Sequence, residues 1–398
     1  MSMINFAVSH LKSAWKGPAF TLHVDGLTEV IGQGESQTTV TVSNPAVMKG
    51  ILTNPSLAIG EAYMEGDLQI EGDLLSLLQG FYATGDALSN ATILKKLRSI
   101  TKIIPKKVPK ADAIQNARHH YDIGNDFYKL WLDSSMAYTC AYYANENDDL
   151  HTAQVQKFDL VCRKARLQPG QTIVDLGCGW GGLIFHAVEN FGVTATGVVA
   201  AQEQAAYIEV EAKRRGLQDK VKVQCSDWRD ATGIYDRVLS VGMLEHVGFK
   251  QYPEFYELVH KLLTEDGIAF VHSIGRMKPH PVSADPWISK YIFPGHYVPA
   301  LEHMVHYPAV AGLHIVDVEN LWQHYTKTLI HWAENYTKHR AEIMKMYDEK
   351  FDRMWWLYLM GSIAAFKWGG LELYQTVMTK NKQVTWPLQR EVGVGKNK

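Results

Sequence analysis

The chain has 398 residues, which is long for a single hydrophobic core and favours two units of unequal size. Hydrophobic residues make up 46% of it and charged residues 21%, so its composition is that of a globular protein and not of a disordered one. The formal net charge of -2 excludes a general attraction to nucleic acid or to anionic membranes, and a charge-driven partner would need a local basic patch.

Cysteine usage and hydropathy suggest the compartment. The four cysteines form no CxxC pair, which favours a reducing environment and argues against a structural zinc or other metal site. His10, Lys12 and Lys16 interrupt the apolar residues of the first twenty, unlike a signal peptide, and no apolar run is long enough to span a bilayer. We therefore expect a cytoplasmic protein whose contact with any membrane is peripheral.

The first 90 residues predict a small α+β domain. Short strands separated by glycine and polar turns are expected at 20–26, 28–34 and 38–44, and a helical pattern begins near Pro45.

A basic segment follows. Between residues 94 and 120 a single acid, Asp112, stands among eight basic residues: Lys95, Lys96, Arg98, Lys102, Lys106, Lys107, Lys110 and Arg118. One interpretation of residues 91–118 is a solvated linker. The other is a strip that contacts anionic phospholipid headgroups, at up to about 1 kcal/mol per basic residue.

Strands and helices alternate from residue 171 onward. A strand and glycine turn over 172–182 precede further strands at 193–199, 221–227, 236–242 and 267–275, with helices at 183–191, 201–216 and 252–267 between them. This alternation predicts a mostly parallel, doubly wound α/β sheet. The residues after Arg276 are aromatic-rich and are expected to be mainly helical, as a lid or insertion.

The glycine turn is the first motif that points to chemistry. Asp175, Gly177, Gly179 and Gly181 follow a strand and open a helix, without the Gly-Lys-Ser/Thr of a phosphate-binding P-loop. An acid before GxGxG resembles the first motif of S-adenosylmethionine-binding methyltransferases. Asp227 and Trp228 follow a later strand at the same edge of the sheet, where an acid can accept from an adenine amino group and a tryptophan can stack on the ring.

Longer blocks make the resemblance specific. The chain resembles the cyclopropane fatty acid synthases and their mycolic acid relatives from about residue 116 to residue 380. The matching blocks are HHYDIGNDFYKLWLD (119–133), YTCAYY (138–143), VDLGCGWGGL (174–183), SVGMLEHVGFKQY (240–252), VHSIG (271–275), PWISKYIFPG (286–295) and YDEKFDRMWWLYL (347–359). The N-terminal part also resembles the small unit of bacterial members, thought to aid dimerisation and membrane engagement.

The resemblance implies a fold and a reaction. Residues 119–398 would form an S-adenosylmethionine-dependent methyltransferase domain, with a seven-stranded Rossmann-like sheet and a helical acyl-chain-binding insertion. The enzyme would transfer a methylene group to the cis double bond of a phospholipid acyl chain. Its partners would be unsaturated phospholipid, the anionic inner face of the cell membrane and a second copy of itself, and no nucleic acid.

The resemblance also implies site residues. Contacts to S-adenosylmethionine are expected from Tyr138, Thr139, Asp175, Gly177, Gly179, Trp180, Gly181, Gln204, Asp227 and Trp228. A bicarbonate ion beside the cofactor would be held by Cys140, Glu245, His272, Tyr325 and the backbone at Ile274, and would deprotonate a carbocation on the lipid. Aromatic faces stabilise cations, so Tyr121, Trp287, Tyr291, Phe293 and Trp332 are expected to line the substrate.

Two positions depart from the family pattern. Ser362 stands where many relatives have a cysteine in a late helix, and Ala201 replaces a serine of the cofactor segment. Three alternatives stay open beside cyclopropane formation: a methyl-branched or methylene product from the same cation, a non-catalytic lipid-binding relative, and a methyltransferase for small-molecule oxygen or nitrogen acceptors. The last predicts a nucleophilic acceptor and leaves the basic segment unexplained.

Overall fold

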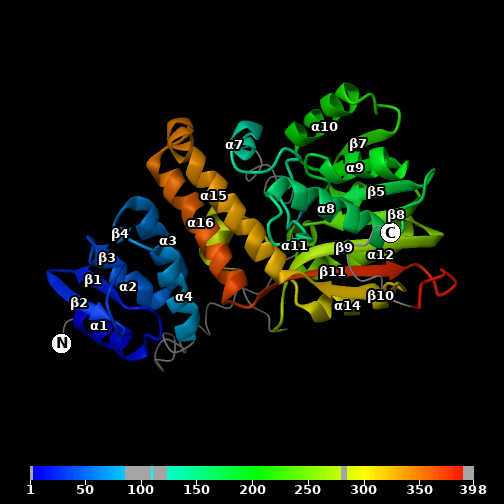
Figure 1. The fold of residues 1–398 in the computed structure, drawn as a ribbon. Coiled ribbons are helices and arrows are strands. Elements are labelled where there is room, and N and C mark those ends of the chain that lie inside the picture. Colours follow the sequence, from blue (N-terminus) through cyan, green and yellow to red (C-terminus); the bar gives the residue numbers. More distant parts are fainter. Residues whose placement is uncertain (1–2, 86–108, 111–122, 279–284, 389–398) are drawn as a thin grey trace. The chain divides into compact units, whose positions relative to one another are not determined.

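The chain forms two compact units (Figure 1), and the computed structural model describes residues 3–85, 109–110, 123–278 and 285–388. Unit 1 draws its described residues from 1–104, 281–294 and 336–370, and unit 2 from 105–280, 295–335 and 371–398. Helix α15, Trp322–Met346, runs from unit 2 into unit 1. The expected domain limits near residues 90 and 119 stay a prediction. They differ from these units because two later segments pack with the N-terminal one.

Unit 1 contains a four-stranded sheet in the order β2-β1-β3-β4. The three strands expected between residues 20 and 44 are present, whereas β4 and helix α1 were not anticipated from the sequence. Trp15 is 7% exposed, and its ring centre is 5.1 Å from that of Phe20 in β1. The elements are α1 (Met3–Ala14), β1 (Phe20–Val24), β2 (Leu27–Ile31), β3 (Thr39–Val42), α2 (Ala46–Thr53), α3 (Pro55–Glu65), β4 (Leu68–Glu71), α4 (Leu74–Thr84), α13 (Pro286–Tyr291) and α16 (Glu349–Lys367).

A buried ion pair joins the two late helices of unit 1. Asp352 of α16 is 2% exposed, and its carboxylate accepts from Arg340 Nε at 2.8 Å and from a second guanidinium nitrogen at 2.6 Å. The Tyr336 hydroxyl donates to the same carboxylate at 3.2 Å. This network satisfies a charge that would otherwise be costly to bury.

Unit 2 contains a seven-stranded sheet in the order β10-β11-β9-β8-β5-β6-β7. Its neighbours from β9 to β7 are parallel, and β11 is antiparallel to both β9 and β10. The strands are β5 (Thr172–Leu176), β6 (Thr194–Val199), β7 (Val221–Cys225), β8 (Tyr235–Val241), β9 (Leu263–Arg276), β10 (His314–Asn320) and β11 (Leu371–Thr379). The predicted α/β class and seven-stranded Rossmann-like sheet are confirmed.

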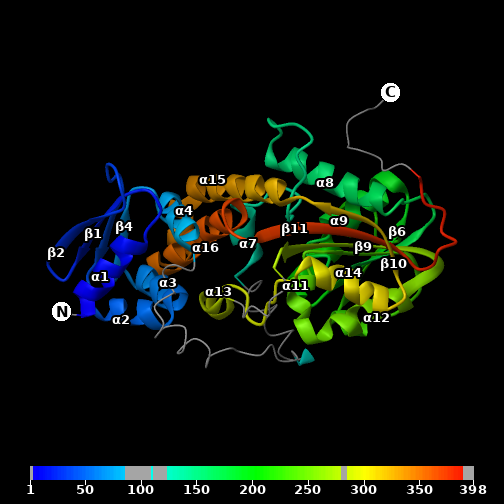
Figure 2. The same ribbon diagram turned by 90° about the horizontal axis from the view of Figure 1, so that it is seen from below.

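Helices cover both faces of this sheet. Figure 2 shows α8 and α9 on one face and α12 and α14 on the other. Alternate residues along the strands follow this division: Ile173, Leu239 and Phe270 belong to the core on the α8 face, and Val174 and Val238 to the other. The helices of unit 2 are α7 (Asn125–Lys129), α8 (Leu150–Lys164), α9 (Gly182–Phe191), α10 (Gln202–Arg214), α11 (Leu244–Val247), α12 (Tyr252–Leu262) and α14 (Leu301–Val310).

The segment after Arg276 is mainly helical, as expected, with the helices α13 to α16. It also supplies the strands β10 and β11, which were not anticipated from the sequence pattern. Strand β11 carries Gln375 and Thr376, both fully buried, in place of a continuous apolar run. Buried polar residues in a central strand hide the pattern by which such strands are usually recognised.

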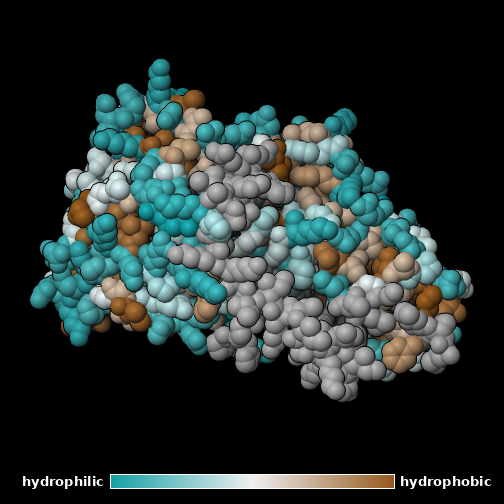
Figure 3. Space-filling model, turned by 180° about the vertical axis from the view of Figure 1, so that it is seen from behind, coloured by the Kyte–Doolittle hydropathy of each residue, from teal (hydrophilic) through white to brown (hydrophobic). Residues whose placement is uncertain are grey.

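The surface and the helices bear on membrane contact. In the described part of the chain, no helix is long and apolar enough to cross a membrane. On the face drawn in Figure 3, hydrophobic residues form several separate patches among hydrophilic ones. Across those same described residues, no group of three or more His, Cys, Asp or Glu is arranged to hold a metal ion.

Candidate active site

The strand order of unit 2 places a ligand site at one edge of the sheet. From β5 the chain passes through α9 to β6 and through α10 to β7, and it then returns to β8 on the other side of β5. Ligands of doubly wound sheets bind at the carboxyl ends of the strands where the order reverses in this way. The turn after β5 and the segment after β8 therefore meet at the expected place.

The glycine turn leaves its backbone open on one side. Gly177, at φ +84°, and Gly179, at φ +56°, adopt left-handed conformations that favour glycine. A Cβ atom on Gly177 would lie 2.5 Å from Met243 Cγ, whereas one on Gly179 would meet no atom within 4 Å. Gly177 is thus required by packing against the segment after β8. The space at Gly179 fits a turn whose backbone a cofactor approaches closely.

A buried acid and a buried amine lie beside this turn. Asp175 is 2% exposed, and its Oδ1 has no hydrogen-bond partner among the described residues. Burial raises the pKa of Asp175 to about 7, although nearby Lys157 acts in the opposite direction. Lys157 Nζ donates to Thr139 Oγ1 at 2.8 Å, and burial lowers the pKa of this lysine to about 8. Lys157 was not anticipated, because lysine is ordinarily exposed.

Helix α10 holds the predicted Gln204. This residue is 2% exposed, and no described residue bonds its Nε2, so the amide has a donor to offer. Ala201 is the N-cap of α10 and provides no side-chain cap, which is what a serine at this position could have supplied.

Asp227 and Trp228 follow β7 as expected, with protein partners of their own. Both oxygens of the Asp227 carboxylate accept from the Arg229 guanidinium, at 2.6 and 2.9 Å. The Trp228 ring packs edge-on against Phe255, with 5.6 Å between ring centres. Contact with an adenine stays a prediction for both residues.

The segment after β8 places Glu245 against β9. Glu245 lies in the short helix α11, 6% exposed, and its Oε1 accepts from the Ile274 amide at 2.6 Å. Glu245 Oε2 has no hydrogen-bond partner within the described ranges. Burial raises the pKa of Glu245 to about 7, while the Ile274 amide and the Ser273 side chain oppose the rise.

His272 lies two residues before Ile274, opposite Val241 of β8. It is 1% exposed, and its Nδ1 is 3.1 Å from Gln375 Nε2. Burial lowers the pKa of His272 well below its ordinary value, and Lys157 and Lys164 lower it further. The imidazole is therefore neutral, and its Nε2 is without a hydrogen-bond partner in the part of the chain described.

The other two predicted anion ligands differ from each other in character. Cys140 is fully buried, burial raises the pKa of its thiol, and the thiol donates to the Ala141 carbonyl at 3.1 Å. It is therefore a neutral thiol and not a thiolate nucleophile. Tyr325 of α15 is 7% exposed, and its ring contacts that of Trp332 edge-on.

An aromatic cluster joins the glycine turn to α15. Ring centres are 5.0 Å apart between Trp180 and Tyr128, 5.6 Å between Tyr128 and Tyr138, and 5.2 Å between Tyr138 and Trp332. Trp131 is fully buried and contacts both Tyr138 and Trp332. Tyr128 and Trp131 were not selected from the sequence, although both lie in the HHYDIGNDFYKLWLD block.

Contact with the substrate stays a prediction for four of the five aromatic residues that are expected to line it. Trp287, Tyr291 and Phe293 belong to unit 1, and Tyr121 lies outside the described residues. Trp287 Nε1 donates to Met64 Sδ at 3.2 Å, and its ring occupies the space that a Cβ atom on Gly60 would need. Ser362 also lies in unit 1, in α16.

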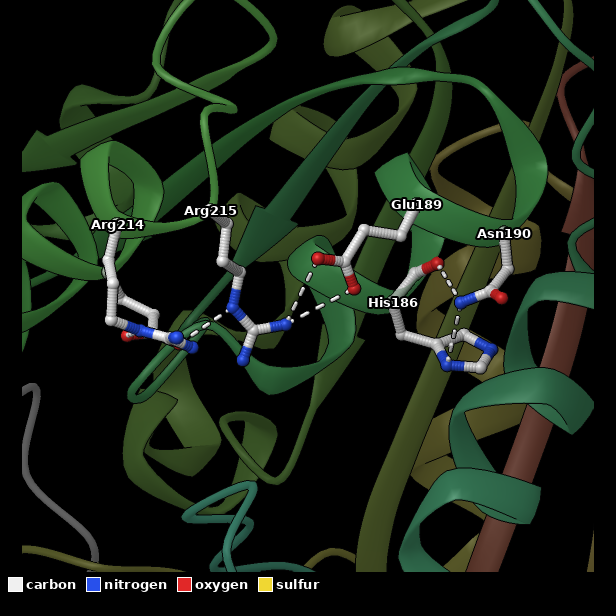
Figure 4. Close-up of polar contacts among 6 residues, drawn as sticks. His186, Glu189, Asn190, Arg214 and Arg215 are labelled. Atoms are coloured by element: carbon white, nitrogen blue, oxygen red, sulfur yellow. Dashed lines mark hydrogen bonds and ion pairs between the residues drawn. The ribbon is translucent and has the colours of Figure 1, made fainter.

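A separate hollow of about 180 Å³ lies where α8, α9 and α10 meet, with Trp180 and Gly182 on its wall. Figure 4 shows the charged groups along it. Arg215 pairs with Glu211 at 2.6 Å and with Glu189 at 3.1 Å. The charged groups of this hollow therefore pair with one another.

Comparison with known proteins identifies the family. Residues 108–376 match the family described as mycolic acid cyclopropane synthetase, and residues 6–92 match a domain of unknown function. The chain belongs to the mycolic acid cyclopropane synthetase family. It is 37% identical over 352 residues to a probable fatty acid methyltransferase of Pseudomonas putida, covering 86% of this chain and 87% of the relative.

Other relatives place the family among S-adenosylmethionine-dependent methyltransferases. The chain is 33% identical over 353 residues to the cyclopropane-fatty-acyl-phospholipid synthase of Escherichia coli K12, covering 87% of this chain and 89% of that one. The structure of the cyclopropane synthase MmaA2 from Mycobacterium tuberculosis matches with a TM-score of 0.64 at 29% identity, over 67% of this chain and 98% of that one.

The buried Glu245 predicts a pH-dependent stability difference. The pKa of Glu245 is raised in the folded state, so its protonated form favours folding below about pH 4.5, and this contribution is lost as the pH rises towards 7. Glu245→Gln mimics the protonated form. The free energy of unfolding of Glu245→Gln, relative to that of the wild type, should increase by up to roughly 3 kcal/mol between pH 5 and pH 8. Urea unfolding at each pH measures both values.

The matched control is Glu257→Gln, an exposed carboxylate on α12. A difference between Glu245→Gln and the wild type that stays constant, or shrinks, over this range would contradict the assigned environment of Glu245.

Proposed function

We propose that this chain is a cyclopropane-fatty-acyl-phospholipid synthase, which adds a methylene group from S-adenosylmethionine across the cis double bond of a phospholipid acyl chain. The observation that carries the proposal is the buried Glu245. Its pKa is raised to about 7, one oxygen is fixed by the Ile274 amide, and the other has no partner among the described residues. A carboxyl group with a pKa near neutrality is suited to accept a proton.

The glycine turn and its surroundings fit S-adenosylmethionine. The open backbone side at Gly179 would hold its polar parts, together with Asp175 Oδ1 and Gln204 Nε2, which have no hydrogen-bond partner among the described residues. When bound, it supplies the reactive methyl group on a sulfonium. A structure of the related mycolic acid cyclopropane synthase CmaA1, 29% identical to this chain, is a complex with SAH, which supports this assignment.

The residues near β9 fit a small oxygen anion such as bicarbonate. Glu245 Oε2 and His272 Nε2 are buried polar atoms without hydrogen-bond partners in the described residues, and such atoms are rare unless a ligand or water completes them. Glu245, His272, Cys140 and Tyr325 would hold the ion together with the backbone at Ile274. When bound, bicarbonate would supply a further proton acceptor.

The protein's own side chains then have three tasks. Methyl transfer to an alkene leaves a positive charge on the acyl chain, and the faces of Tyr138 and Trp332 can stabilise such a charge. The buried aromatic cluster with Trp131 excludes water, which would otherwise trap the cation. Glu245 Oε1 is hydrogen-bonded to β9. Its Oε2, which has no partner among the described residues, provides the base.

The names of the relatives guide the choice of substrate. The Escherichia coli relative is a cyclopropane-fatty-acyl-phospholipid synthase, and the Pseudomonas putida relative is a probable fatty acid methyltransferase. The second name keeps a methyl-branched or methylene product open as the alternative outcome of the same cation. The acceptor in both cases is an acyl chain.

Mass spectrometry of the product tests the reaction. The protein is incubated with vesicles of unsaturated phospholipid and S-adenosylmethionine that carries a deuterated methyl group. We expect the lipid to gain CD2, because one deuteron leaves as the ring closes, and NMR then distinguishes a ring from a methylene group. Binding of the cofactor without a mass gain on any lipid would contradict the proposal.

Glu245→Gln tests the base. The amide keeps the bond from the Ile274 amide but takes up a proton poorly, so turnover should fall at least about a hundredfold, while the dissociation constant of S-adenosylmethionine stays within a few-fold. Radiolabel transfer and calorimetry measure the two quantities. Turnover close to that of the Glu257→Gln control would refute this role.

Membrane contact through the basic segment is a further part of the proposal, together with a peripheral location at the inner face of the cell membrane and homodimer formation. Most of this segment lies outside the described residues. Lys110 is described, and its exposed amine pairs with Asp230 at 2.5 Å. Asp230 is therefore a protein partner that competes with lipid headgroups for this lysine.

Charge removal tests the basic segment. Replacement of Lys106, Lys107 and Lys110 by glutamine should weaken binding to anionic vesicles at low salt by at least about fivefold, since each lysine contributes up to about 1 kcal/mol. Co-sedimentation measures this. The control removes the same charge at the exposed residues Lys213, Lys220 and Lys222. Equal binding by both triple variants would return the segment to the role of a linker.

A further inference from the structure

A row of polar residues crosses three strands on the α8 face of the sheet. His272 of β9 lies directly opposite Gln375 of β11, and Gln375 lies directly opposite Glu319 of β10. His272 is 1% exposed and Gln375 is fully buried. Directly opposed residues of neighbouring strands project from the same face, so these three side chains form one continuous row.

Lys164 of α8 determines how the Gln375 amide is oriented. Its ammonium group donates to Gln375 Oε1 at 2.7 Å and also pairs with Glu319, and it lies 3.7 Å from Asp317. An ammonium group can only donate, so the atom that it contacts must be the amide oxygen. The NH2 group of Gln375 is therefore the one that faces His272. The donor character of the ammonium group therefore fixes the orientation of this amide.

The amide orientation in turn determines the tautomer of His272. Gln375 Nε2 is 3.1 Å from His272 Nδ1, and an amide nitrogen can only donate, so Nδ1 must be the acceptor. Burial and the two nearby lysines, Lys157 and Lys164, keep the pKa of His272 well below its ordinary value, so the ring is neutral. A neutral ring whose Nδ1 accepts carries its proton on Nε2. That nitrogen has no hydrogen-bond partner among the described residues.

We propose that Gln375 and Lys164 are positioning residues that hold His272 as the Nε2–H tautomer, so that it presents a hydrogen-bond donor to an oxygen anion in the site. This inference rests on the proposed function for the identity of the site. It divides the work between the two buried groups: His272 donates and orients, and proton acceptance falls to Glu245. A tautomer with a bare Nε2 would face the same anion with a lone pair and repel it.

A purely structural role for the row makes a different prediction. If Gln375 served only to satisfy a buried ring nitrogen, then any partner for Nδ1 would do. A glutamate side chain at this position would be an adequate replacement, because a carboxylate accepts from an Nδ1–H group and pairs with Lys164. Both roles predict that Gln375→Glu transfers the ring proton to Nδ1 while the protein stays folded, but only the positioning role predicts that turnover falls as a result.

NMR of the ring nitrogens tests the inference directly. The full chain is labelled with [15N]histidine and studied without cofactor or lipid, and the His272 signals are assigned by their loss in His272→Gln. The wild type should show a protonated Nε2 and an unprotonated Nδ1. Gln375→Glu should show a protonated Nδ1, and Lys164→Met a mixture, because the freed amide can turn over.

The control is Gln224→Glu in β7, at the opposite edge of the same sheet, which makes the same chemical change and should leave the His272 signals as they are. A protonated Nδ1 in the wild type would overturn the inference. So would a Gln375→Glu spectrum that matches the wild type.

Activity measurements separate this inference from the proposed function. Gln375→Glu should lower turnover at least about tenfold with little change in the dissociation constant of S-adenosylmethionine. If the tautomer is as stated and no lipid is modified, the proposed function alone is wrong. If lipid is modified and Gln375→Glu is as active as the control, the positioning role alone is wrong.

Discussion

The packing of α8 against the sheet is the constraint on which the site depends. This helix presents Lys157 and Lys164 to the same face of the sheet, because seven residues make almost two helical turns. Their side chains are largely buried, and burying an amine is costly unless it finds acceptors. Lys157 finds Thr139, and Lys164 finds Gln375 and Glu319. The polar residues of the sheet are thus arranged around two ammonium groups.

Burial is the largest influence on the pKa values at the strand ends, and these two lysines modify its effect. Both lower the pKa of His272, and Lys157 also opposes the burial that raises the pKa of Asp175. Glu245 lies beyond them, in α11, where burial is the largest influence and its pKa rises to about 7. The proposed site would therefore combine a neutral imidazole with a carboxyl group whose pKa is about 7. Environments that push the pKa values of two titratable groups apart in this way are typical of sites of acid–base catalysis.

The sequence was sufficient for the parts whose signal is local. The strands from β5 to β9 alternate with amphipathic helices, and the spacing of the glycines predicts the glycine turn. Strand β11 was missed because Gln375 and Thr376 interrupt its apolar pattern. Gln375 is covered by Lys164 of α8, more than 200 residues earlier in the chain. Lys164 and Lys157 were not selected from the sequence because lysine is ordinarily exposed. Only the folded structure shows that these lysines, in a helix of ordinary polar character, are buried.

The aromatic residues expected to line the substrate are divided between the two units. Trp332 and Tyr138 lie together in unit 2, but the aromatic residues taken from the 286–295 block belong to unit 1 and pack with α3 and α16. A matching block identifies a residue's family position and says little about its neighbours. Tyr128 and Trp131 make the opposite case, since their role in the cluster became visible only from ring distances.

The position of β11 in the sheet has a consequence for biosynthesis. This strand follows every other strand of its sheet in the chain, yet it lies between β9 and β10. Until it has emerged from the ribosome, β9 is an open edge with unpaired backbone groups, a hazard for aggregation. The partner of the His272 imidazole arrives with the same strand. A nascent chain that has already formed the glycine turn therefore still lacks the hydrogen-bond partner of His272.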